Sequence, residues 1–124
     1  MSMLTAFCNQ FVAFFEDLSL TYPEENDISL GYQALKLMKQ ANPRLIHSVF
    51  LQVVDAEFGK NILEENEEYV VERAKTVLET EYANMAYIFR IFDKHWSTMS
   101  DTNKEHIWKY LKSLVLLANK VPKA

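Results

Sequence analysis

Apolar residues recur every three or four positions along most of this chain, which is the period of a helix with one buried face. The clearest case is the stretch 103–118, in which the lysines fall between the apolar positions. A helix this apolar, carrying a tryptophan, needs other helices to cover it, so we expect it at the centre of the fold. Its predicted inward positions are Ile107, Trp108, Leu111, Leu114, Val115 and Ala118.

The same period predicts a Phe-rich first helix over 4–18. We expect Tyr22-Pro23 to end it, because the residue before proline avoids the helical region. A second helix is predicted over 27–40, with Asn26 or Asp27 as N-cap. Its predicted inward face runs through Ile28, Tyr32, Leu35, and Met38 or Lys39.

Asn42-Pro43 predicts a sharp helix start, because asparagine is a strong N-cap and proline suits the first helical position. The helix predicted from there covers 43–57, and Phe58-Gly59 is predicted as its C-terminus. Residues 60–66 are predicted as a connector with one turn around Ile62-Leu63.

A long helix is predicted over 67–95, with a kink expected between Thr80 and Asn84. Glu81 lies close to its apolar stripe, where an ion pair with a nearby arginine or lysine is expected. The last helix is predicted over 101–119, capped by Ser100, or by Thr102 with Glu105 three positions later.

These elements predict an all-α fold of one domain covering 1–124. With only two glycines and three prolines in 124 residues, the chain favours long helices with few turns over a sandwich. We expect an antiparallel bundle of five helices over 4–18, 27–40, 43–57, 67–95 and 101–119.

Charge and cysteine content restrict the expected partners and cellular location of the protein. The chain has a net charge of −4 and no Arg-rich run, so we expect no nucleic acid partner. No apolar run predicts a membrane span or a signal peptide. The single cysteine, Cys8, is predicted to be a buried thiol, and with no disulfide possible within the chain we expect an intracellular, cytoplasmic protein.

Metal and catalytic motifs are weak in this sequence. His95, His106 and Asp93 flank one loop, but helix-end roles explain them better than a metal site. Residues 55–66 resemble a calcium loop but lack glycine at the sixth position and glutamate at the twelfth. There is no phosphate-binding glycine loop and no GxSxG motif. We therefore predict no enzyme activity, no cofactor, no metal and no small-molecule substrate.

A protein partner or self-association is the remaining expectation. Residues 55–81 hold nine acidic and three basic residues, whereas 90–124 hold three acidic and seven basic, so copies of the chain can attract one another. Exposed apolar side chains would mark a partner groove. The candidate contact residues are Phe14, Phe15, Leu116, Leu117, Glu64, Glu65, Glu67 and Glu68.

Three segments carry a resemblance. The Phe-rich residues 11–18, the Asn42-Pro43 helix start and the ending over 103–118 resemble small all-helical proteins encoded by large double-stranded DNA viruses of algae and amoebae. The resemblance implies a viral protein that acts in the infected host cell or is packaged in the virion, and it implies no catalytic residues.

The sequence thus predicts a non-enzymatic helical protein that works through protein–protein contacts, as a structural, virion-associated or assembly component. The alternative is a host-modulating protein that binds a partner in a groove, like the helical mimics of death regulators that viruses carry. A metal-binding or enzymatic role is the third and weakest interpretation.

Overall fold

The structure is a computed structural model that describes residues 2–80 and 86–122, except the side chains of 78, 79 and 86–89. Every regular element in these ranges is helical, which confirms the all-α prediction. None of their helices is long and apolar enough to cross a bilayer. The elements are α1 (Met3–Thr21), α2 (Asn26–Ala41), α3 (Pro43–Phe50), η1 (Leu51–Asp55), α4 (Ala56–Leu63), α5 (Glu67–Thr80), α6 (Ala86–Trp96) and α7 (Asp101–Lys120).

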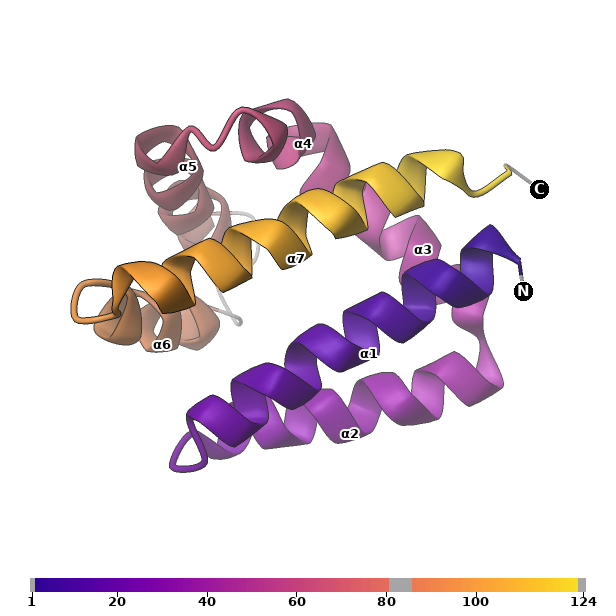
Figure 1. Cartoon of the computed structure of the whole chain (residues 1–124), viewed down its shortest axis with the longest axis horizontal. Helices are drawn as coiled ribbons and strands as arrows, with labels where there is room; N and C mark the ends of the chain where they lie inside the picture. The colour runs from indigo at the N-terminus through magenta and orange to yellow at the C-terminus, as the bar shows by residue number, and fades with distance from the viewer. Residues whose placement is uncertain (1, 81–85, 123–124) are drawn as a thin grey trace.

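Helices α1 and α7 form the centre of the molecule. They run antiparallel, so the two ends of the chain lie at the same end of the fold, and α2 returns along α1 (Figure 1). Of the predicted inward positions on α7, Leu111 is only partly buried, and the other five are buried. The expectation that α7 lies at the core is therefore confirmed. The buried apolar residues described are Phe7, Cys8, Ile46, Phe50, Phe58, Ile62, Val77, Trp96, Ile107, Trp108, Leu114, Val115, Ala118 and Val121.

Local capping chemistry sets most helix starts. The Asn42 side chain accepts a hydrogen bond from the backbone N–H of Leu45, and Pro43 is the first residue of α3, as predicted. Ser100 caps α7 by accepting from the N–H of Asn103 at 3.2 Å, so the alternative cap at Thr102 is wrong. The N-cap of α2 is Glu25 rather than Asn26 or Asp27, and its side chain bonds no N–H of the first turn.

The predicted helix end at Phe58-Gly59 is wrong. A π-helical segment, η1, joins α3 to α4, and the helix continues to Leu63. Gly59 lies buried inside α4 with a negative φ, so it does not supply a left-handed turn. Its lack of a side chain instead makes room, because an added Cβ would come 2.5 Å from Asp55 Oδ1 and 3.8 Å from Val115 Cγ1.

Helix α4 ends in a Schellman motif, in which Glu65 takes the position usually held by glycine. Glu65 adopts a left-handed conformation with φ 51°. Its N–H donates to Ile62 O, and the N–H of Asn66 donates to Asn61 O, which is the hydrogen-bond pair of this motif. The connector between α4 and α5 is therefore short, and the turn predicted around Ile62-Leu63 belongs to α4.

The single helix predicted over 67–95 corresponds to two elements, α5 and α6. Each buries a different side chain, Val77 from α5 and Trp96 from α6, and the two helices contact one another. Six helical rods result in the described residues, counting 43–63 as one, so the antiparallel five-helix bundle is matched only roughly. The expected kink and the ion pair at Glu81 fall on 80–84, of which 81–84 lie outside the described residues.

Candidate functional site

A cleft of about 560 Å³ lies between α1, α2, α6 and the start of α7. Its walls are mainly aliphatic and aromatic, and this size and lining are typical of sites that bind apolar ligands. Its lining residues are Phe11, Phe15, Leu18, Tyr22, Asp27, Ile28, Leu30, Gly31, Ala34, Leu35, Ile91, Phe92, His95, Met99 and Ile107.

Helix α2 forms the outer wall of the cleft and buries none of its residues. The predicted inward face is confirmed at Ile28, Tyr32 and Leu35, which are half-buried. Gly31 allows α1 to approach closely, because a Cβ there would lie 3.1 Å from the Phe15 ring. The side of α2 away from this inward face carries Leu30 and Leu37, which are 65% and 68% exposed, and Leu30 also reaches the edge of the cleft. An apolar surface therefore continues from the cleft onto the outside of α2.

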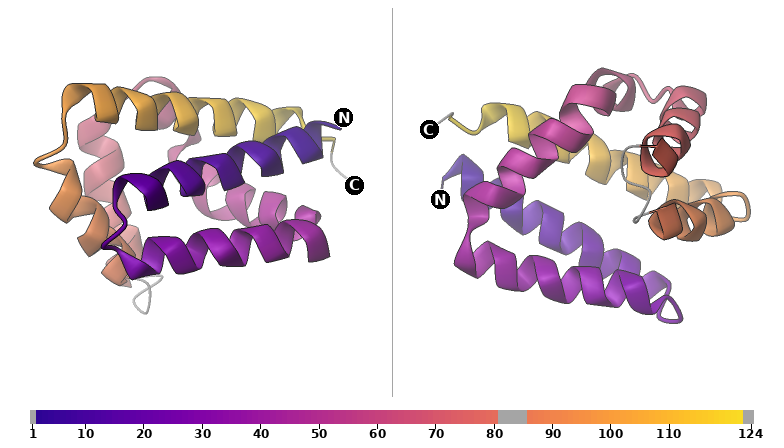
Figure 2. Two further views of the ribbon diagram at one scale, coloured as in Figure 1. Left: turned by 60° about the horizontal axis from the view of Figure 1, so that its bottom comes forward. Right: turned by 180° about the vertical axis from the view of Figure 1, so that it is seen from behind.

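One end of the cleft is closed by a polar clasp between the α1–α2 turn and α6. Glu25 Oε1 lies 2.8 Å from His95 Nε2 and 3.0 Å from Lys94 Nζ. These two hydrogen bonds lower the pKa of the Glu25 carboxyl. The His95 ring also packs against Tyr22, with centroids 4.1 Å apart and ring planes tilted by 34°. Figure 2 shows α6 beside the α1–α2 turn, at the end of the molecule away from both termini.

The clasp is also where the structure places the one three-residue set in the described residues with metal-ligand spacing. Ligand atoms of Glu24, Glu25 and His95 lie within 4.8 Å of one another. Lys94 bonds the same Glu25 oxygen, so a cation already satisfies that oxygen. The candidate set His95, His106 and Asp93 is not brought together, because His95 is in the clasp and His106 lines a different hollow.

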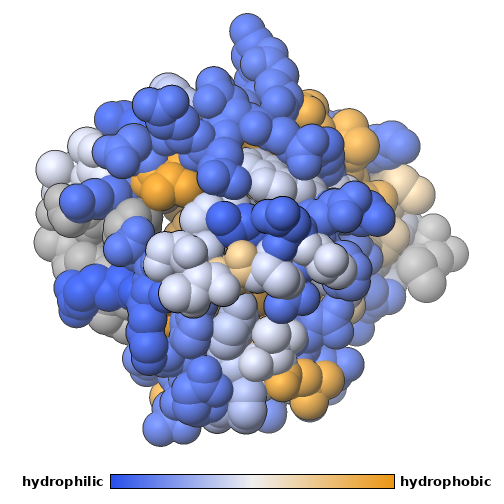
Figure 3. Space-filling model, turned by 60° about the vertical axis from the view of Figure 1, so that its left-hand side comes forward, coloured by the Kyte–Doolittle hydropathy of each residue, from blue (hydrophilic) through white to orange (hydrophobic). Residues whose placement is uncertain are grey.

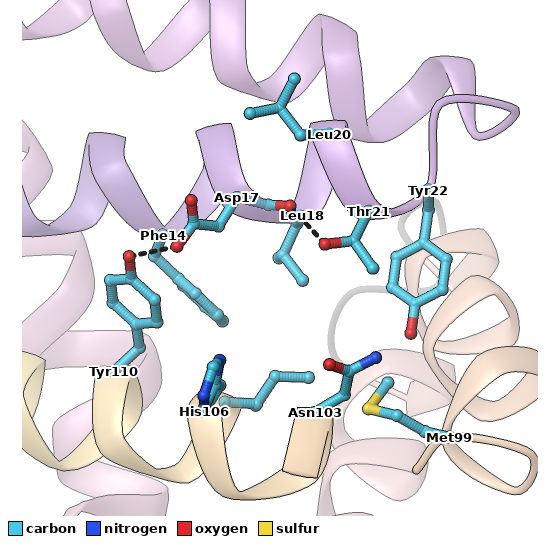
Figure 4. Close-up of a pocket in the computed structure, with 11 residues that line it drawn as sticks. Phe14, Asp17, Leu18, Leu20, Thr21, Tyr22, Met99, Asn103, His106 and Tyr110 are labelled. Atoms are coloured by element: carbon cyan, nitrogen blue, oxygen red, sulfur yellow. Dashed lines mark hydrogen bonds between the residues drawn. The ribbon is translucent and has the colours of Figure 1, made fainter.

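That second hollow, of about 290 Å³, lies between α1 and the first half of α7 (Figure 4). The Tyr110 hydroxyl donates to Asp17, and this bond raises the pKa of Tyr110 to about 12. Thr21 donates to the backbone oxygen of Asp17 at 2.7 Å. The Tyr110–Asp17 bond ties α7 to α1, whereas the Thr21 bond lies within α1, and His106 and Asn103 remain exposed polar groups at the rim.

The predicted contact residues do not form one surface. Phe15 lines the large cleft, whereas Phe14 packs on the core and lines the small hollow. On α7, Leu116 is 50% exposed and Leu117 packs against the core. Four glutamates at the α4–α5 turn are exposed, and one of them, Glu65, pairs with Lys112 at 2.9 Å. These four residues are Glu64, Glu65, Glu67 and Glu68.

The exposed leucines of α2 are candidate contact residues that were not predicted from the sequence. Their signal is a second apolar stripe through Leu30, Ala34, Leu37 and Ala41, on the side of the helix away from the predicted inward face. Figure 3 shows the side of the molecule at the left of Figure 1, where polar residues predominate and apolar residues appear as separate small patches.

The one thiol offers no reactive group to either hollow. Cys8 is 1% exposed, as predicted, and burial raises its pKa. Its Sγ faces the carbonyl oxygen of Pro43 at 3.7 Å.

Comparisons with protein-family models, with curated proteins and with solved structures returned no match.

Proposed function

We propose that this protein is a non-enzymatic binding protein that holds an amphipathic helix of a protein partner in the cleft between α1, α2 and α6. The observation that carries the proposal is the apolar cleft of about 560 Å³, whose outer wall is a helix with no buried residue. Such a helix leaves apolar surface in water, and surface of this kind is typical of interaction sites.

The shape of the apolar surface favours a helix over a small ligand. The surface does not stop at the cleft, because Leu30 lines it while Leu37, two turns further along α2, lies outside it. A partner helix presents anchors at i, i+3, i+4 and i+7, which suits an elongated apolar surface of this kind. A small molecule would use only the enclosed part.

The charge at the mouth of the cleft favours a partner that carries basic residues. Glu24 and Asp27 are exposed there, and Asp27 forms no ion pair in the described part of the chain. Glu25 is already bonded by His95 and Lys94. An occupant with basic residues at this end gains favourable electrostatic contacts, so we propose a basic amphipathic helix.

The test compares two model peptides that differ only in charge. One is an amphipathic leucine–lysine helix and the other is the same pattern of leucine and glutamate. Fluorescence anisotropy of labelled peptides should show tighter binding of the leucine–lysine helix. Ala34→Trp, which fills the cleft, should weaken that binding at least about tenfold, whereas Gln33→Trp, on the exposed polar side of α2, should not. Equal binding by both variants would refute the proposal.

The viral resemblance adds a proposal about where the partner is found. It implies a partner in the infected host cell or in the virus particle, with the protein acting as an assembly component or as a host-directed binder. Detection of the protein in purified particles would favour the first role.

A further inference from the structure

The exposed stripe on α2 has the spacing of a helix-pairing seam. Leu30, Ala34, Leu37 and Ala41 are separated by four, three and four positions, and all four are exposed. This is the a/d spacing through which two helices pack side by side. Every other α-helix buries at least one of its described side chains, whereas α2 buries none and carries this second apolar stripe on its outer side.

Charges at the two ends of this stripe are opposite in sign. Asp27 lies at its N-terminal end, just after Glu24 in the preceding turn, and its C-terminal end is followed by Arg44 in the first turn of α3. Neither Asp27 nor Arg44 forms an ion pair within the described residues. Two antiparallel copies of α2 would place acidic end against basic end, whereas two parallel copies would place Asp27 near its own equivalent.

We propose that a second copy of this chain covers the stripe, with the two α2 helices antiparallel about a two-fold axis near Ala34. Ala34 is small, so the helices approach closely where they cross. In this register Leu37 of one copy lies beside Leu30 and Gly31 of the other, at the edge of the cleft. This inference rests on the proposed function and identifies the occupant of the outer part of the cleft as α2 itself.

Sedimentation equilibrium of the full chain over a range of concentrations tests the inference. One helix pair buries less than the roughly 1,600 Å² of a standard interface, so we expect a monomer–dimer equilibrium rather than a permanent dimer. Leu37→Glu should raise the dissociation constant at least about tenfold. Leu116→Glu changes another exposed leucine, on α7, and should leave the constant unchanged. A chain that stays monomeric at all concentrations would overturn the inference.

A charge exchange tests the antiparallel register. Asp27→Arg and Arg44→Asp should each weaken the dimer, and the double variant should restore it. If the double variant is as weak as the single ones, the register is wrong. Circular dichroism confirms that the variants stay folded, as expected for exposed positions.

The peptide-binding proposal and the dimer proposal can be refuted independently of each other. Arg44→Asp should also weaken the dimer, and Arg44 lies outside both the cleft and the apolar surface of α2, so this variant can be tested with the leucine–lysine peptide at concentrations where it is monomeric. Peptide binding without any dimer in the original chain refutes only the dimer. A dimer whose monomeric variant does not bind the peptide refutes only the proposed function.

Discussion

The Nε2 atom of His47 lies 2.8 Å from the carbonyl oxygen of Ala118, and this hydrogen bond ties α3 to the last turns of α7. A carbonyl only accepts, so Nε2 carries the proton. The ring is buried between Phe7, whose centroid is 5.5 Å away, and α7. His47 thus joins residues 71 positions apart and satisfies a polar group at the core.

Replacing His47 by leucine should destabilise the fold. The substitution removes the donor and leaves a buried carbonyl without it, which costs about 1–3 kcal/mol of unfolding free energy. Urea denaturation followed by circular dichroism measures the loss. His106→Leu, at an exposed histidine, is the control and should change the unfolding free energy much less.

Glycine at position 65 should stabilise the protein. Glu65 holds a left-handed conformation, which costs an L-residue about 1–2 kcal/mol and costs glycine little. The exposed pair with Lys112 is lost, at about 0–1 kcal/mol, so we expect a small net gain. Glu64→Gly, at a neighbour with φ −87°, should instead lower the urea midpoint. A lower midpoint for both variants would contradict the assignment of the Schellman motif.

The two glycines should respond differently to alanine. Gly59→Ala brings Cβ to 2.5 Å from Asp55 Oδ1, so Asp55 must move away from Asn119, whose Nδ2 it accepts from at 3.0 Å. We expect a loss of about 1–3 kcal/mol in unfolding free energy. Gly31→Ala meets the Phe15 ring at 3.1 Å and gains helix propensity, so its net effect should be smaller. Thermal unfolding of both variants makes the comparison.

The Glu25 clasp predicts a dependence of stability on acid pH. The pKa of Glu25 is lowered by bonds from His95 and Lys94, so its contribution is present above the ordinary value of 4.5 and is lost as pH falls through the lowered pKa. The Glu25→Gln variant should be less stable than the original chain at neutral pH, and the difference in their free energies of unfolding should become smaller as the pH falls. Urea midpoints measured across this range test the sign, and a gap that widens in acid would contradict it.

Local chemistry made part of the fold predictable. The stops and starts at Tyr22-Pro23, Asn42-Pro43 and Ser100 depend on residues within one helical turn, and the sequence contains all of that information. The inward face of α7 follows from its period alone. These features need no knowledge of what lies across the core.

The errors arose where the deciding group is distant in the chain or where two patterns compete. Gly59 looks like a helix end, but it is required by close packing beside Asp55 and Val115. The continuous apolar period predicts one helix over 67–95, whereas the structure has the two elements α5 and α6 there, and the residues between them lie outside the described part of the chain. The clasp joins Glu25 to His95 across 70 positions, and no local pattern predicts such a pairing. The sequence of α2 has apolar residues on two faces, and only the more apolar inward face was predicted to make contacts.

Chemical-shift mapping is the most direct test of whether the cleft beside α2 is the binding surface. Amide spectra are recorded as the leucine–lysine peptide is added to the labelled Arg44→Asp variant, in which the dimer is weakened and the apolar surface is unchanged. Binding in the cleft should produce shifts that concentrate at cleft residues such as Gly31, Ala34 and Ile91. Shifts that concentrate instead at Leu116, Leu117 and the glutamates over 64–68, or no shifts at all, would contradict it.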